Sequence, residues 1–252
     1  QAATTLLEYL TGAKKTAPAA VAKQKAVKNS SQPTLSDGAK PSENYGYYDP
    51  APERRIVIFD LETKKSAEEV GGWNNVHLME LAVGVVYDSQ EKKYIRYWEE
   101  DVNRLVEKLL SADLVVGFNH EWFDYGVLKG YTDIDLARQA KSFDILSDIK
   151  KRLGYRLSLN HLAQETLGKQ KTADGLVSLK WWKEGKHEQV ADYCEMDVAI
   201  TKELFEFGLE KGRLLYRMKN GESVRLNLDW DLDAIIADAA KEPAHTKRRI
   251  RF

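Results

Sequence analysis

Two carboxylates stand at the end of one apolar stretch of the chain. The β-branched run at residues 55–60 has the length of a buried strand, and it leads into Phe59-Asp60-Leu61-Glu62-Thr63. Side chains alternate along a strand, so Asp60 and Glu62 are predicted to project from one face and Phe59 and Leu61 from the other. Burying two like charges is costly without a divalent cation held by oxygen ligands. The alternative is a frayed strand end whose acids are solvated.

Two later stretches add an acid each. Asp124 closes the segment at 117–124, which follows a second apolar run and precedes a predicted helix. The alternative is that Asp124 only stabilises the helix, because a negative charge interacts favourably with the positive end of the helix dipole. Tyr193 and Asp197 are four residues apart in a long amphipathic helix, so they share one face. The alternative is a pair on the surface.

Together the three stretches have a family resemblance. Asp-x-Glu at a strand end, Asn-x-x-x-Phe-Asp after a later strand and Tyr-x-x-x-Asp on a late helix occur here in that order. This resembles the exonuclease motifs of the DnaQ-like, DEDDy branch of the ribonuclease H-like superfamily, over about residues 54–210. The segments that most resemble the YprB-like group, whose members are often associated with helicases, are Ser142-Phe-Asp-Ile-Leu, Leu159, Leu167-Gly168, Trp181-Trp182 and Tyr193.

The resemblance implies a role for each of these residues. Asp60, Glu62, Asp124 and Asp197 would hold two Mg²⁺ or Mn²⁺ ions, and Tyr193 would orient the attacking water. Three further residues are expected at the substrate: Thr63 and Asn119 beside the terminal nucleotide, and Asp144, for which a helix cap is the alternative.

The activity that the resemblance implies is 3′–5′ exonucleolytic hydrolysis of DNA or RNA, in DNA repair or nucleic-acid processing, with a helicase as a candidate partner. Two alternatives belong to other classes: a non-catalytic nucleic-acid-binding module, and the proofreading domain of a polymerase. Such modules usually lose metal ligands, whereas all four acids and the tyrosine are present here. No polymerase motif is found in the 252 residues, so the proofreading alternative needs a separate partner.

Composition limits the classes of partner. With 38 Lys and Arg against 39 Asp and Glu, the net charge is -1, so a nucleic-acid surface must be a local patch. The basic side chains around 150–156 and around Trp181-Trp182 are candidates, with a solvated helix face as the alternative. No apolar run approaches the roughly 20 residues that span a bilayer. Cys194 is the only cysteine, which fits a reducing compartment, and a cytoplasmic protein is expected.

The elements that must position these residues follow from periodicity. Strands are predicted at 55–60, 78–87, 93–99 and 113–118, with a hairpin between the second and third. Helices are predicted at 102–110, 124–129, 142–153, 157–167, 176–184 and 188–210, and a second hairpin turns at Asn220-Gly221. The expected fold is therefore α/β: a ribonuclease H-like mixed β-sheet flanked by helices, with a disordered N-terminal arm and a C-terminal β-hairpin.

Three parts are expected along the chain. Residues 1–53 are a short helix and a flexible linker rich in Ala, Ser, Pro and Lys, for which a nucleic-acid-binding arm is the alternative. Residues 54–215 form the exonuclease domain, and 216–252 form the hairpin and a basic tail. The first residue is Gln1 rather than Met, which is typical of a segment cut from a longer protein.

Overall fold

The fold is known from a computed structural model, which describes residues 54–169 and 175–241. The predicted N-terminal helix, the linker and the basic C-terminal tail lie outside the described residues. Within them, no helix is both long and apolar enough to cross a membrane.

A five-stranded mixed sheet forms the centre of the fold. Its strands lie in the order β3-β2-β1-β4-β5. They are β1 (Ile56–Thr63), β2 (Leu81–Asp88), β3 (Lys93–Trp98), β4 (Leu114–Gly117) and β5 (Ser142–Asp144). The central strand β1 is antiparallel to β2 and parallel to β4, and β2 and β3 form the predicted hairpin. The predicted mixed sheet is therefore confirmed.

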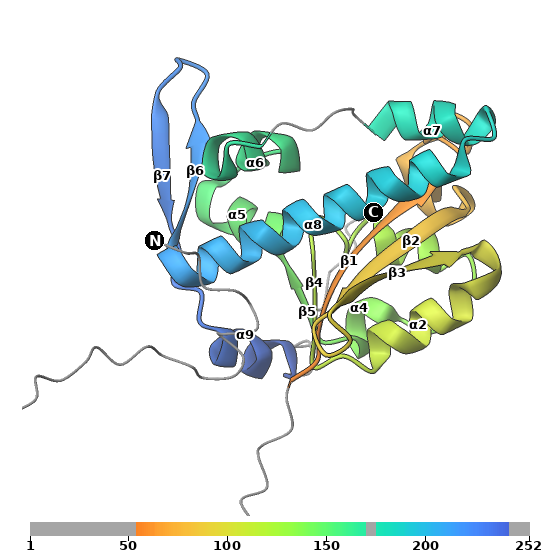
Figure 1. Ribbon diagram of the computed structural model, residues 1–252, viewed down its shortest axis with the longest axis horizontal. Coiled ribbons are helices and arrows are strands. Elements are labelled where there is room, and N and C mark those ends of the chain that lie inside the picture. Colours follow the sequence, from red (N-terminus) through yellow and green to blue (C-terminus); the bar gives the residue numbers. More distant parts are fainter. Residues whose placement is uncertain (1–53, 170–174, 242–252) are drawn as a thin grey trace, which may run out of the picture.

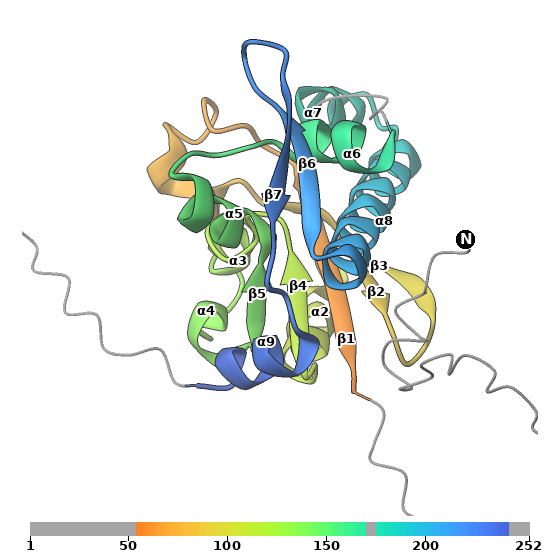
Figure 2. The same ribbon diagram turned by 90° about the vertical axis from the view of Figure 1, so that its left-hand side faces the viewer.

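Helices cover both faces of the sheet. The long helix α8 (His187–Lys211) crosses one face, and α2 (Val102–Leu110) and α3 (Asp124–Leu128) lie on the other (Figures 1 and 2). The side chains of β1 divide between two hydrophobic cores: Ile56 and Ile58 pack on the α8 side, Val57 and Phe59 on the other. Alternation along β1 therefore directs every second residue toward α8, and Asp60 and Glu62 continue that series.

The remaining elements lie around this core. They are the 3₁₀ helices η1 (Trp73–Leu78) and η2 (Glu99–Asp101), the helices α4 (Leu136–Gln139), α5 (Ile145–Leu153), α6 (Leu159–Leu167), α7 (Gly175–Lys183) and α9 (Leu232–Ala239), and the hairpin strands β6 (Arg213–Arg217) and β7 (Ser223–Asn227). The hairpin tip and the helices α6 and α7 lie at the same end of the molecule (Figures 1 and 2).

Two predicted boundaries are wrong. The segment 142–153 was expected as one helix, but its first three residues form β5, because they pair with β4 and Asp144 then caps α5. So short an edge strand leaves no periodic signal in the sequence. Leu78, expected at the start of a strand, ends η1 instead, and its side chain is 49% exposed. The elements η1, α4 and α9 were not predicted.

Candidate active site

Strand β1 delivers two acids to one point of the molecule. Phe59 and Leu61 are buried at 0% and 3% exposure, whereas Asp60 and Glu62 are partly exposed on the face that carries α8. The alternation predicted for this strand is therefore observed. A frayed end does not describe it, because β1 stays paired with β2 as far as Thr63.

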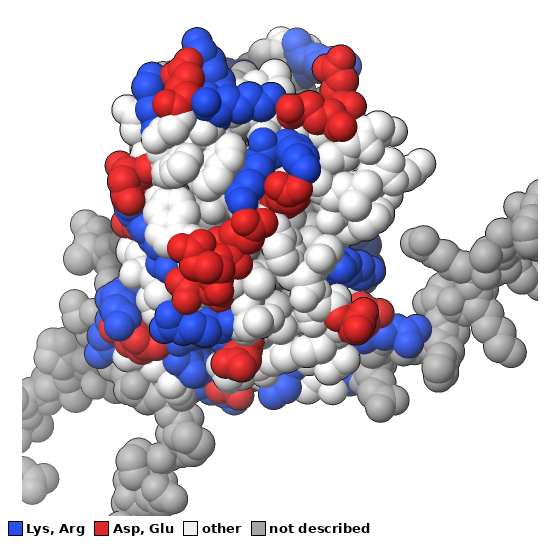
Figure 3. Space-filling model, turned by 90° about the vertical axis from the view of Figure 1, so that its right-hand side faces the viewer, with Lys and Arg blue, Asp and Glu red and all other residues white. Residues whose placement is uncertain are grey.

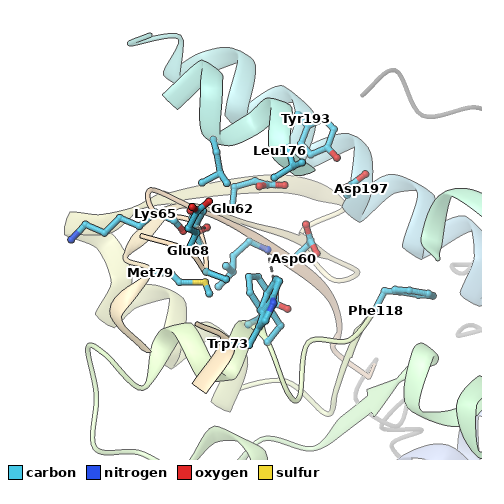
Figure 4. A pocket seen from close by; sticks show the side chains of 17 residues that line it. Asp60, Glu62, Lys65, Glu68, Trp73, Met79, Phe118, Leu176, Tyr193 and Asp197 are labelled. Atoms are coloured by element: carbon cyan, nitrogen blue, oxygen red, sulfur yellow. Dashed lines mark hydrogen bonds between the residues drawn. The ribbon is translucent and has the colours of Figure 1, made fainter. Parts of the chain in front are cut away.

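Helix α8 supplies the third acid. Asp197 and Tyr193 are one turn apart on the helix, and their exposures are only 5% and 3%. One carboxylate oxygen from each of Asp60, Glu62 and Asp197 lies within 4.8 Å of the others. Figure 4 shows the two strand acids projecting toward α8, where Asp197 and Tyr193 are located. Such a group of hard oxygen donors matches the ligands that Mg²⁺ and Mn²⁺ prefer.

Asp124 lies beside this cluster at the start of α3. Its Oδ1 accepts a hydrogen bond from the backbone N–H of Leu61 at 3.0 Å, which ties α3 to the end of β1 that carries Asp60 and Glu62. Burial, and next the negative charge of Asp144, raise the pKa of the Asp124 carboxyl well above its ordinary value. Asp124 lines the same cavity as the three clustered acids, although its oxygens are not part of the group that lies within 4.8 Å. A cation in that cavity would offset the cost of its charge.

Ser178 of α7 also contacts the cluster, although it was not among the predicted site residues. Its hydroxyl donates to Glu62 Oε2 at 2.5 Å, and its side chain is completely buried. A hydrogen bond to a carboxylate fixes the orientation of that carboxylate. The one signal in the sequence is a serine inside the apolar run Leu176-Val-Ser-Leu179.

The lone cysteine packs against the same strand. The Cys194 sulfur lies 3.4 Å from the Asp60 carbonyl oxygen and 3.8 Å from Asp60 Oδ2. Burial, followed by the charge of Asp60, raises the pKa of the Cys194 thiol well above its ordinary value. The thiol therefore stays protonated and serves as a small buried donor between α8 and β1, not as a nucleophile.

The three residues predicted to contact substrate have different surroundings. Thr63 is buried and its hydroxyl donates to the Lys65 carbonyl at 3.0 Å, on the wall of the main cavity. Asn119 adopts a left-handed backbone conformation with φ 70°, which asparagine tolerates well, and its Oδ1 accepts from Arg156 at 2.9 Å. Asn119 lines a second hollow, which also contains Asp60 and Asp197.

Asp144 organises the loop that follows β4. Its Oδ1 accepts from the backbone N–H groups of Asn119 at 2.9 Å and Ser147 at 3.1 Å, and its Oδ2 accepts from Glu121 at 3.2 Å. The predicted alternative of a helix cap is therefore observed at the start of α5. A contact between Asp144 and substrate stays a prediction.

His120 is a core histidine beside the loop that follows β4. The side chain is fully buried, and its ring meets the Tyr125 ring edge-on at 5.1 Å. Burial lowers the pKa of His120 to about 4, against the opposing effect of the Asp144 charge. Gly117 makes room for the ring, because a Cβ there would lie 2.7 Å from it.

An aromatic wall borders the main cavity, whose volume is about 730 Å³. Trp73 and Phe123 line it, and Trp122 packs on both of them with ring centroids 6.1 and 6.2 Å away. Trp73 and Trp122 are 60% and 52% exposed, which is unusual for side chains of this size. Exposed rings beside a carboxylate cluster offer a surface on which a nucleobase can stack.

Surface charge is evenly mixed on one side of the molecule. On the face in Figure 3, which looks at the right-hand side of Figure 1, groups of Lys and Arg lie directly beside groups of Asp and Glu. Among the basic residues around 150–156, Arg152 pairs with Asp148 and Asp229. The partly buried Trp181 and Trp182 pack against the core; Trp181 meets the Tyr193 ring and Trp182 stacks on His187. This packing supports the alternative of a helix face for the Trp pair.

The fold and the acid cluster define a class: an α/β protein with a mixed sheet and, at the end of its central strand, a group of carboxylates that could hold a metal ion. A family model described as the RNase H superfamily matches residues 57–207, and the chain belongs to that superfamily.

Two other comparisons complete this result. The family B DNA polymerase from the hyperthermophilic archaeon Pyrobaculum calidifontis is similar over 64% of this chain, with 15% identity and a TM-score of 0.47. The match spans 24% of the polymerase chain, so this chain corresponds to about a quarter of that protein. Among curated proteins, none matches.

Proposed function

We propose that the protein is a metal-dependent 3′–5′ exonuclease of the DEDDy type, most similar to the YprB-like group, that hydrolyses phosphodiester bonds of DNA or RNA. The observation that carries the proposal is the cluster of Asp60, Glu62 and Asp197, with ligand oxygens within 4.8 Å of one another. Membership in the RNase H superfamily suggests nuclease activity, and nucleases of this superfamily use divalent metal ions.

The donor set fits hard divalent cations. The four predicted ligands line one cavity together with a fifth carboxylate, Glu68, and Cys194 is not among the residues that line it. Asp60, Glu62, Asp124 and Asp197 would hold two Mg²⁺ or Mn²⁺ ions. When bound, the ions supply activation of the attacking water and stabilisation of the leaving 3′-oxygen.

Residues of the chain perform the other tasks. Tyr193 lies one turn before Asp197 on the wall of the cavity, which supports its role in positioning the attacking water. Ser178 holds Glu62 through the 2.5 Å hydrogen bond. The wall with Trp73 and Phe123, together with Thr63, accommodates the terminal nucleotide. Asn119, predicted beside the terminal nucleotide, lines the second hollow and not the main cavity, so its proposed contact is with the part of the strand that lies there. A helicase partner rests on the family resemblance alone.

The experiment is degradation of single-stranded and duplex DNA and RNA labelled at the 5′ end, with Mg²⁺ or Mn²⁺. We expect a descending ladder from the 3′ end and release of mononucleotides. The control is Asp60→Asn, which removes a metal ligand and should abolish the ladder. Immediate release of the labelled 5′ nucleotide would exclude the proposed polarity, and binding without hydrolysis would indicate the non-catalytic alternative.

A further inference from the structure

A hollow at the β6–β7 hairpin leads to the acid cluster. It has a volume of about 780 Å³ and lies between residues 155–157, His161 and hairpin residues 216–220; we call it the hairpin hollow. Arg156 and Leu157 line it, and they also line the second hollow, which contains Asp60 and Asp197. The two hollows are therefore adjacent, and the hairpin begins beyond residue 207, where the match to the RNase H superfamily ends.

The hairpin hollow combines aromatic, apolar and basic groups. Tyr155 is 46% exposed and meets the Tyr216 ring edge-on, with centroids 6.5 Å apart. Met218 is 43% exposed, and the side chains of Arg156 and Lys219 are exposed beside it. Exposed rings next to cations are the combination that binds single-stranded nucleic acid: bases stack on the rings and phosphates pair with the cations.

Helix α6 fixes the hairpin in place. Thr166 Oγ1 accepts from the Leu215 N–H at 2.9 Å and donates to the Leu215 carbonyl at 3.0 Å. Five residues before Thr166, His161 Nε2 accepts from the backbone N–H of Arg217 at 2.9 Å, and the Arg217 side chain pairs with Glu165. These bonds occupy backbone groups of β6 that would otherwise form an open sheet edge. The hairpin is therefore held in one position before any ligand binds, which lowers the entropy cost of binding.

We infer that the hairpin hollow holds the single-stranded nucleic acid a few nucleotides away from the acid cluster. The inference rests on the proposed function in one respect: the 3′–5′ polarity of cleavage sets the direction in which the strand runs through the two hollows. Its chemistry is independent of hydrolysis: Tyr155 provides a face for a base, and Lys219 and Arg156 neutralise phosphates. A strand that fills both hollows crosses Asp60 and Asp197, so the bond to be cleaved lies between the hairpin hollow and the main cavity.

Two substitutions test the inference. Tyr155→Ala removes the ring, and Lys219→Glu reverses one charge; each should weaken binding of a 12-nucleotide single strand by about tenfold. Binding is measured by fluorescence anisotropy in the Asp60→Asn background, so that the strand is not cleaved. Tyr155→Phe keeps the ring and should bind like the parent. Lys219→Glu should also reduce the slope of log affinity against log salt by about one.

Two controls separate local effects from damage to the fold. Lys129→Glu changes an exposed lysine that lines neither hollow and should leave the affinity unchanged. With Asp60 restored, hydrolysis of a dinucleotide, which reaches only the acid cluster, should be the same for the hairpin variants as for the wild type. Unchanged affinity of Tyr155→Ala and Lys219→Glu for the 12-nucleotide strand overturns the inference, and so does an equal loss on the dinucleotide. If the wild type hydrolyses neither substrate but both variants still bind the strand more weakly, the proposed function fails and the hairpin inference is supported.

Discussion

Ser178 offers a sharp test of how the acid cluster is held together. Ser178→Ala removes the 2.5 Å hydrogen bond to Glu62 Oε2 at a completely buried position. Hydrogen bonds to charged groups contribute about 1.5–3 kcal/mol, and a short O–H···O⁻ bond belongs to the strong kind. If losing this bond costs about 1.4 kcal/mol of metal-binding free energy, the affinity for the metal falls tenfold. Residues that orient metal ligands typically alter affinity by 10- to 100-fold, which agrees with this value.

The assay is calorimetric titration of Mn²⁺ into the wild type and Ser178→Ala, together with unfolding temperatures measured with and without Mn²⁺. We expect about tenfold weaker binding and a smaller stabilisation by the metal, because a ligand stabilises only the state that binds it. Ser147→Ala, an exposed serine on α5, is the matched control and should change neither quantity. If Ser178→Ala lowers the unfolding temperature but binds Mn²⁺ like the wild type, Ser178 only packs α7, and its hydrogen bond does not orient Glu62 as a metal ligand.

Three further predictions concern the acids, the tyrosine and the core histidine. Tyr193→Phe should lower single-turnover cleavage by about 10²-fold with unchanged Mn²⁺ affinity, whereas Asp197→Asn should reduce both; wild-type cleavage by Tyr193→Phe would make the tyrosine a packing residue. The pKa of Asp124 is raised, so the folded protein loses stability as pH rises through that pKa and the carboxyl becomes charged. Asp124→Asn should therefore raise the metal-free unfolding temperature, and it should also abolish cleavage. A lower metal-free unfolding temperature would contradict this. The lowered pKa of His120 means that the neutral, buried ring adds to the free energy of unfolding above about pH 6.5, and that this addition is lost as pH falls toward about 4. Between pH 7 and pH 4, the free energy of unfolding, measured with denaturant, should therefore fall by up to about 3 kcal/mol less in His120→Phe than in the wild type.

The parts of the site that the sequence predicts are those set by local periodicity. Asp60 and Glu62 share a face because strands repeat every two residues, and Tyr193 and Asp197 share a face because helices repeat every 3.6. Both relations hold whatever packs around them. That β1 and α8 then meet could be predicted only from the resemblance to a known fold.

Contacts between elements distant in the chain were not predictable in this way. Ser178 reaches Glu62 across 116 positions, and this contact depends on how α7 settles over β1. The place of the hairpin likewise depends on the bonds between Thr166 and Leu215, 49 positions apart. The strand β5 forms because β4 offers a neighbouring edge, and its three residues carry no pattern of their own. Tertiary packing decides each of these features, and residue spacing does not encode it.

The most direct test of the central claim is anomalous diffraction from crystals of the protein grown with Mn²⁺. We predict anomalous peaks between β1 and α8, with carboxylate oxygens of Asp60, Glu62 and Asp197 at about 2.1 Å from the ions, the distance typical of small hard cations. Crystals of Asp60→Asn should lose these peaks. Fully occupied Mn²⁺ elsewhere and none at this cluster would contradict the assignment of these acids as the metal centre.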